Sequence, residues 1–162
     1  MRLIKHLFAI PTRRVFPADS LQRITAAIAA SEARHTGELR FAVESALHPR
    51  AVLAGMQARD RARDAFAQLR VWDTRANNGV LLYLLLADHR IEIVADRGFD
   101  GLVSAEQWRG ACLLIEERLK AGEPEAAVLR GLEALSALIE QHFPRDADYV
   151  DLNELPDDPH LL

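Results

Sequence analysis

The segment DRGFDG, residues 96–101, places acidic side chains and glycines at a spacing that could serve cation binding. Asp96 and Asp100 offer carboxylate oxygens, and Gly98 allows a sharp turn of the backbone. The pattern is similar to the first half of a calcium loop, in which oxygen ligands alternate along the chain. Two ligands are missing, because Gly98 stands where a side-chain oxygen is needed and Gln107 stands where a bidentate glutamate closes the cage. The segment is therefore either a weak Ca²⁺ or Mg²⁺ site or, more simply, a glycine-rich connection between a strand and a helix.

A second group of polar residues precedes an almost unbroken apolar run. Asn77 and Asn78 carry amide oxygens, and Gly79 allows the backbone to approach a ligand closely. These residue types are equally typical of a turn that faces no ligand, which is the commoner case. The metal-site hypothesis therefore combines Asn77, Asn78, Asp96 and Asp100.

Other catalytic patterns are absent from the sequence. The six histidines show no HExxH spacing, and no GxSxG, Walker-type or GxGxxG motif occurs. Cys112 has no neighbouring cysteine and shares a helical stripe with Trp108 and Ile115, which predicts a core thiol and not a nucleophile. Residue chemistry alone thus identifies no reaction.

Composition and charge narrow the class of protein. A chain of 162 residues with 49% hydrophobic residues is expected to form one globular domain with a sizeable core. The formal net charge of −4 disfavours a nucleic-acid partner, which usually selects a basic surface. The apolar stretches 7–10 and 80–87 are too short for a signal peptide and for a membrane-spanning helix of about 20 residues, so a cytoplasmic protein is expected.

Hydrophobic periodicity predicts alternating helices and strands. The run VLLYLLLA, residues 80–87, shows no alternation, which is typical of a central strand covered on both faces. The other predicted strands span 38–46 and 90–96, and the second of these forms a hairpin with the central strand. The predicted helices span about 19–35, 49–69, 104–121 and 124–143. This order predicts an α/β fold, a three-layer α/β/α sandwich with a small mixed sheet and helices on both faces.

Three local details of these elements can be compared with a structure. Alternation in residues 38–46 predicts a half-exposed strand, with Arg40 and Glu44 on its outer face. The helix over 49–69 is expected to run without a break and to bury Leu53. Capping boxes are predicted at two helix starts, where Asp19 or Ser20 precedes Gln22 and where Ser104 precedes Gln107.

The two ends of the chain carry opposite charge. Residues 1–15 form a basic segment without acidic side chains, and residues 144–162 form an acidic tail, so the domain itself spans 16–143. Four leucines interrupt the acids of the tail: Leu152, Leu155, Leu161 and Leu162. Docking on the basic segment or on a neighbouring subunit would bury some of these leucines, so residues 146–162 are expected to be at least partly ordered against the domain.

Three stretches together identify a family resemblance: SEARHTGELRFAVESAL, NNGVLLYLLLADHRIEIVADRGF and EAAVLRGLEALSALIEQHF. Their specific parts are the Thr36-Gly37 step before the first strand, the Asn78-Gly79 entry to the central strand, and the turn at Gly98. In this order and spacing, over residues 16–143, the chain resembles the TPM domain of bacteria and plant thylakoids. Thr36, Gly37, Gly79 and Gly98 are thereby placed at a crevice.

The resemblance implies an α/β/α sandwich tied to the maintenance or assembly of membrane proteins. Plant members are described as acid phosphatases, several members bind divalent cations near the mouth of the central strand, and most carry a signal peptide and a membrane anchor. This chain departs from that pattern. The family commonly has Asp-Asn-Gly where this sequence has Asn77-Asn78-Gly79, and an Asn-Asp pair where this sequence has Val15-Phe16-Pro17. Loss of these carboxylates weakens any cation site, because hard cations gain most from charged oxygens.

Three hypotheses about function stay open. The first is a non-enzymatic accessory or interaction domain that supports a membrane or envelope protein complex, with a protein partner and a degenerate site for weakly bound Ca²⁺ or Mg²⁺. The second is a metal-dependent acid phosphatase. The third is a structural homo-oligomer that is held together by its oppositely charged ends.

Overall fold

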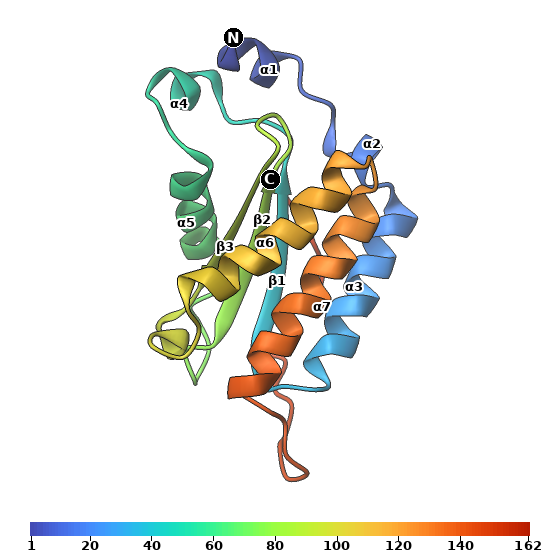
Figure 1. The fold of residues 1–162 in the computed structure, drawn as a ribbon, viewed down its shortest axis with the longest axis vertical. Helices are drawn as coiled ribbons and strands as arrows, with labels where there is room; N and C mark the ends of the chain where they lie inside the picture. Colours follow the sequence, from blue (N-terminus) through green and yellow to red (C-terminus); the bar gives the residue numbers. More distant parts are fainter.

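The computed structural model describes residues 1–162 as one four-stranded sheet with helices on both faces (Figure 1). The strands are β1 (Glu38–Glu44), β2 (Gly79–Leu85), β3 (Arg90–Ala95) and β4 (His160–Leu161). The helices are α1 (Arg2–Leu7), α2 (Thr12–Val15), α3 (Ala18–Glu32), α4 (Pro49–Leu53), α5 (Ala58–Gln68), the short 3-10 helix η1 (Arg97–Phe99), α6 (Ala105–Lys120) and α7 (Pro124–His142). The predicted three-layer α/β/α fold with a mixed sheet is confirmed.

The sheet has the strand order β3-β2-β1-β4. β1 and β2 are parallel, with Glu38 opposite Gly79, and β2 and β3 form the predicted antiparallel hairpin. β4 pairs in parallel with the free edge of β1. The first residues of β1 and β2 therefore lie together, beside the last residue of β3, at what is called here the amino end of the sheet. The last residues of β1 and β2 and the β2–β3 turn define its carboxyl end.

One face of the sheet packs against α3, α6 and α7. Leu39, Phe41 and Val43 of β1 point to this side and are fully buried, because residues two apart on a strand share a face. They join a cluster of 21 buried residues that includes the apolar stripes of the three helices. This larger core contains Cys112, and burial raises the pKa of its thiol to about 11. The prediction of a core thiol is confirmed.

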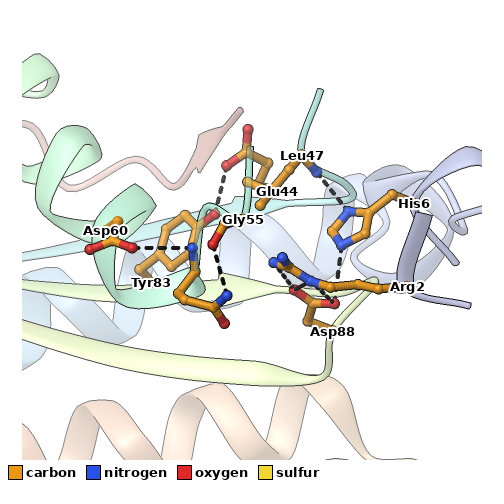
Figure 2. Close-up of polar contacts among 9 residues, drawn as sticks. Arg2, His6, Glu44, Leu47, Gly55, Asp60, Tyr83 and Asp88 are labelled. Atoms are coloured by element: carbon orange, nitrogen blue, oxygen red, sulfur yellow. Dashed lines mark hydrogen bonds and ion pairs between the residues drawn. The ribbon is translucent and has the colours of Figure 1, made fainter. Parts of the chain in front are cut away.

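The opposite face of β1 is also buried, so the prediction of a half-exposed strand was wrong. All seven residues of β1 are buried, because α5 and the C-terminal tail cover the face that carries Arg40 and Glu44. Glu44 accepts hydrogen bonds from the Tyr83 hydroxyl at 2.6 Å and from Arg61 at 2.8 Å (Figure 2 shows the first). Charged residues in this strand are therefore neutralised by partners that are distant in sequence, which alternation cannot reveal.

The predicted continuous helix over 49–69 is also corrected. It consists of α4 and α5, which are separated at Gly55, where φ is +80°. Leu53 is 73% exposed, and the buried side of α5 is made of Ala58, Ala62 and Ala65. These small alanines let α5 lie close to the sheet. Larger apolar residues, such as Leu53, had been expected to make this contact.

Two helix starts were predicted from capping boxes, and one of them is present. Ser104 accepts from the Gln107 amide at 3.2 Å, and the Gln107 side chain accepts from the Ser104 amide at 2.9 Å. α3 instead begins at Ala18 after Pro17, without a side-chain cap, so the Asp19 or Ser20 box was wrong. Ser20 lies inside α3, as its third residue, and therefore cannot cap the start of the helix.

The tail crosses the sheet and is ordered along much of its length. Leu155 is 4% exposed in the smaller core beneath α5, and β4 pairs with β1. The expectation of partial order is met, but the tail docks on the sheet of its own chain and not on the basic N-terminal segment. No helix of the structure is long and apolar enough to cross a membrane.

Candidate functional site

The amino end of the sheet brings together most residues of the predicted site. Asn78 is 1% exposed, and its amide nitrogen donates to the carbonyl of Thr36 at 3.2 Å, which ties the entry of β2 to the entry of β1. The backbone amide of Asn78 donates to the Thr74 hydroxyl at 3.1 Å. The side-chain oxygen of Asn78 is buried and has no hydrogen-bond partner. Asn78 thus holds the entries of β1 and β2 together, while its side-chain oxygen stays without a hydrogen-bond partner.

The three glycines of the predicted crevice lie at close backbone contacts. A Cβ on Gly79 would overlap the carbonyl oxygen of Val71, and a Cβ on Gly98 would overlap that of Asn77. A Cβ on Gly37 would meet the side chain of Ile139 at 2.5 Å. Because each glycine touches protein atoms, the space that its missing side chain leaves is already filled.

Asp96 and Asp100 differ in their surroundings. Asp96 follows β3, and its Oδ1 accepts from the Arg97 amide at 2.8 Å at the start of η1, whereas its Oδ2 is buried without a partner. Asp100 is exposed at the end of η1. Asn77 adopts the left-handed conformation, with φ of +51°, and its carbonyl accepts from the Gly98 amide at 2.8 Å. No three His, Cys, Asp or Glu side chains lie close enough together anywhere in the chain to hold a metal ion.

A cavity of about 570 Å³ opens at the amino end beside Thr36 and Asn78. Its other wall belongs to the tail and contains Asp146, Asp148 and Glu154. The Glu154 carboxylate also accepts from the Arg75 amide, at 3.1 Å. Sequence reasoning did not assign these tail acids to the site. The acidic run was visible, but its position over the sheet depends on contacts between residues more than a hundred positions apart.

Beneath the tail lies a group of buried charged residues that the sequence did not mark as a cluster. Glu38 accepts from the amides of Glu154 at 3.1 Å and Leu155 at 3.4 Å. Burial raises the pKa of Glu38 to about 7 despite these hydrogen bonds. Arg40 donates to the Pro156 carbonyl at 3.2 Å and contacts the His160 ring. These contacts fasten the tail to β1.

The same group extends to the end of α3. Glu32 accepts from the Leu39 amide at 2.7 Å, and burial raises the pKa of its carboxyl to about 9. Burial also lowers the pKa of His35 to about 4, so this ring stays neutral beside the carbonyl of Gly37. Neutral forms of buried groups are expected where water is excluded and no opposite charge compensates. The amino end therefore holds acids and a histidine whose charge is suppressed.

The carboxyl end of the sheet has a different character. A cavity of about 410 Å³ lies between the N-terminal segment, the end of β2 and the α6–α7 turn. Eight of its eleven lining residues are hydrophobic, among them Phe8, Ile10, Leu84 and Leu119. The sequence contains no motif here, so pattern analysis did not identify this cavity.

A polar anchor holds α1 at the carboxyl end (Figure 2). Asp88, in the β2–β3 turn, accepts from Arg2 at 2.8 Å and contacts His6 Nε2 at 3.0 Å. His6 Nδ1 accepts from the Leu47 amide at 2.9 Å, so the proton of the neutral ring must lie on Nε2 and be donated to Asp88. Burial opposes ionisation of Asp88, but the hydrogen bonds from Arg2 and His6 outweigh it and lower its pKa.

The protein is an α/β/α domain with one four-stranded sheet. Neither end of that sheet carries a recognisable catalytic constellation. The model of the TPM domain matches residues 12–138, and this chain belongs to the TPM domain family.

The comparison with solved structures agrees with this assignment. The chain is similar to the NMR structure of the BA42 protein from the psychrophilic bacterium Bizionia argentinensis, with a TM-score of 0.79 and 27% sequence identity. The similarity covers 91% of this chain and 95% of the other. No curated protein matches the chain.

Proposed function

We propose that this TPM domain acts as an interaction domain without a reaction of its own, in the cytoplasm, as an accessory to a membrane or envelope protein complex. The observation that carries the proposal is the pair of contacts that the Asn78 side chain makes with Thr36. The amide group of Asn78 faces Thr36 and joins two strands, which is a structural task. Asp96 is then the one carboxylate of the predicted ligand set that lies partly buried at this end, and one of its oxygens caps η1.

A site of this kind binds divalent cations weakly. Ca²⁺ takes six to eight oxygen ligands, and its affinity rises with the number of charged ones. Metal-assisted phosphate hydrolysis needs a firmly held ion that polarises the substrate and activates water. With Asn77 in a turn and Asp100 exposed at the end of η1, the set supplies too little charge for that task. We expect dissociation constants of about 1 mM or weaker.

One observation favours the alternative of a metal-dependent acid phosphatase. The Oδ1 atom of Asn78 and the Oδ2 atom of Asp96 are both buried and have no hydrogen-bond partner. Buried oxygens of this kind are rare, and an ion or an ordered water commonly satisfies them. A cation that used both, together with backbone carbonyls at the β2 entry, would strengthen the site.

Titration of the chelator-treated protein separates these two functions. Ca²⁺ and Mg²⁺ are added while amide signals are followed by NMR and the heat of binding is measured by calorimetry. The test variant is Asp96→Asn, which keeps the cap on η1 but removes the charge, and the matched control is Asp100→Asn on the exposed side. We expect shifts near Asn78 and Asp96 only at millimolar cation, and no hydrolysis of p-nitrophenyl phosphate.

Micromolar affinity that Asp96→Asn abolishes and Asp100→Asn preserves would overturn the interaction-domain proposal. Metal-dependent hydrolysis of p-nitrophenyl phosphate with the same sensitivity would establish the phosphatase in its place.

A further inference from the structure

The N-terminal helix α1 turns Arg2 and His6 inward together with Leu3, which packs against the smaller core. His6 is buried, and Arg2 and His6 both contact Asp88 beneath the helix (Figure 2). Exposed apolar residues occupy the outer side and the turn that follows, with Ile4 and Leu7 each 56% exposed and Phe8 82% exposed. In a helix that only covers a core, the apolar side would face inward. The anchor instead fixes an apolar surface toward the outside.

This apolar surface continues beyond α1. Ile10 is 58% exposed, and Phe8 and Ile10 also border the cavity of about 410 Å³ at the carboxyl end of the sheet. Leu86 and Leu119 form part of the opposite wall of that cavity. Contiguous exposed apolar residues on one end of a monomer mark a surface that meets another apolar phase or partner.

Cations without acidic partners surround the apolar surface. Lys5 lies on α1 and at the cavity, Arg13 and Arg14 lie on α2, and Arg90 and Lys120 line the neighbouring hollow beside the β2–β3 turn. All five side chains are exposed, and none forms an ion pair or a hydrogen bond in the structure.

Most acids of the same region are paired, whereas Glu117 of α6 is exposed and has no ion pair. The paired acids are Asp19 and Glu125 with Arg23, Asp88 with Arg2, Glu92 with Arg59, Glu116 with Arg109, and Glu123 with Arg118. The carboxyl end therefore presents uncompensated positive charge although the whole chain carries −4. The acidic loop of the tail lies at the opposite end of the molecule (Figure 1), where it would be far from a surface that the carboxyl end approaches.

We infer that the carboxyl end of the sheet docks on an anionic lipid surface. Ile4, Leu7, Phe8 and Ile10 enter the boundary between headgroups and acyl chains, while the five unpaired cations face lipid phosphates. Apolar insertion and a basic patch act together in reversible membrane attachment, because either alone is marginal. The charges select an anionic bilayer as the occupant, since an uncharged partner would gain nothing from them.

This inference names the membrane side of the proposed interaction domain, but it rests on the opposite end of the sheet from the cation site. Vesicle binding and cation titration therefore report on separate surfaces, and each can fail while the other succeeds.

Sedimentation with lipid vesicles tests the inference on the full chain. The vesicles contain phosphatidylcholine alone or phosphatidylcholine mixed with phosphatidylglycerol, at low and at high salt. One variant is Phe8→Gln, which changes a side chain that is 82% exposed, and the other is the double variant Arg13→Gln/Arg14→Gln. The matched controls are Leu113→Gln, at a 47% exposed leucine of α6, and Arg75→Gln/Arg97→Gln at the amino end.

We expect binding to the mixed vesicles and not to phosphatidylcholine alone, and loss of binding at high salt because screening shortens the range of the charges. Each test variant should weaken binding about tenfold, whereas each control should stay within about twofold of the parent. Melting temperatures measured in parallel should be unchanged, because all substituted side chains are exposed.

Absence of binding to the mixed vesicles at low salt would overturn the inference. So would equal losses in the test and control variants. Concentration-dependent dimerisation that Phe8→Gln abolishes, in a protein that ignores vesicles, would assign the surface to a second copy of the chain instead.

Discussion

The two ends of the sheet differ in how completely their residues are engaged. At the amino end, Asn78, Gly79 and Gly98 contact neighbouring backbone so closely that little of their chemistry stays free. At the carboxyl end, Phe8 is exposed and Lys5 has no acidic partner. The amino end keeps a polar cavity of about 570 Å³ and two unpartnered oxygens, whereas the carboxyl end has an exposed apolar surface with unpaired cations.

This difference teaches that turn residues and ligand residues share the same sequence signature. Asparagine and glycine serve tight turns and cation sites for the same reasons, namely a short amide side chain and a permissive backbone. In α/β folds, ligands usually bind beyond the carboxyl ends of parallel strands. The apolar cavity here lies beside the carboxyl end of β2, with Leu84 and Leu86 in its wall. Topology therefore points to the carboxyl end, whereas residue type points to the amino end.

The largest effect should follow substitution of Gly79, which would disrupt the close packing at the entry of β2. In Gly79→Ala, the new Cβ overlaps the Val71 carbonyl, so the backbone of β2 or of the preceding turn must move. We expect a loss of about 3 kcal/mol or more in the free energy of unfolding, measured by urea denaturation.

The control is Gly110→Ala in the middle of α6, where nothing lies within 4 Å of the added Cβ. Alanine there should stabilise the protein by about 1 kcal/mol, because it favours the helix more than glycine does. Equal behaviour of the two variants would show that close packing at the β2 entry does not hold this end.

A smaller loss is expected when the anchor of the carboxyl end is cut. Asp88→Asn keeps the size of the side chain but removes the charge that Arg2 and His6 share. Because this contact is largely removed from water, we expect a cost of about 2 kcal/mol and faster amide exchange in α1, measured by hydrogen–deuterium exchange.

Asp73→Asn serves as the control for the anchor. Asp73 pairs with Arg70 on the surface, where both side chains are at least half exposed, and such pairs contribute little. If both variants left exchange in α1 unchanged, the anchor would not be what positions the apolar surface.

The attachment of the tail should weaken as pH rises. The folded-state pKa of Glu38 is raised from its ordinary value of 4.5 to about 7, so folding favours the protonated carboxyl. Its stabilising contribution is complete below about pH 4.5 and is lost as pH rises through 7. Asp151 and Glu154 add negative charge around it and Arg40 adds positive charge, whereas Glu32 stays protonated over this range because its own pKa is about 9.

The loss is limited to about 1 kcal/mol, because the tail can detach and let water reach the carboxylate. Exchange of the Glu154 and Leu155 amides should therefore speed up between pH 5 and pH 8, beyond the intrinsic increase with pH. Glu38→Gln should remove this extra dependence. An identical pH response in the variant would assign the effect to another group.

The smallest effect is expected at Asn77, and it sharpens the distinction between turn and ligand. In Asn77→Gly, glycine adopts the observed φ of +51° without strain, so stability should change by less than about 0.5 kcal/mol. Affinity for Ca²⁺ should also stay the same if Asn77 only turns the chain. A clear fall in affinity, measured by the same calorimetry, would make Asn77 a ligand.

Much of the fold could be predicted because local patterns reflect local physics. The buried run that forms β2, the hairpin to β3 and the Ser104 cap of α6 each depend on residues close in sequence. Two failures were local, namely the break at Gly55 and the uncapped start of α3 after Pro17, and the failure at β1 arose from distant partners. Glu44 looked exposed until Tyr83 and Arg61 were placed against it.

The candidate site divides in the same way. The sequence brought Asn77, Asn78 and Asp96 to one end of the sheet, because the two turns flank neighbouring strands. It could not tell that Asn78 donates to Thr36, which lies 42 residues away. The engagement of a polar side chain depends on what the folded chain places opposite it.

The sequence by itself determined the three layers, the hairpin and the family, because periodicity and short motifs can be recognised without knowing the tertiary contacts. Only the tertiary structure decided that the acidic tail completes the sheet beside β1 and that α1 turns its apolar side outward. Both outcomes depend on long-range contacts, among them those of Glu38 and Arg40 with the tail and of Asp88 with α1. The energy of such a contact depends on distance and burial in the folded state, and neither quantity is encoded in the local pattern of residues.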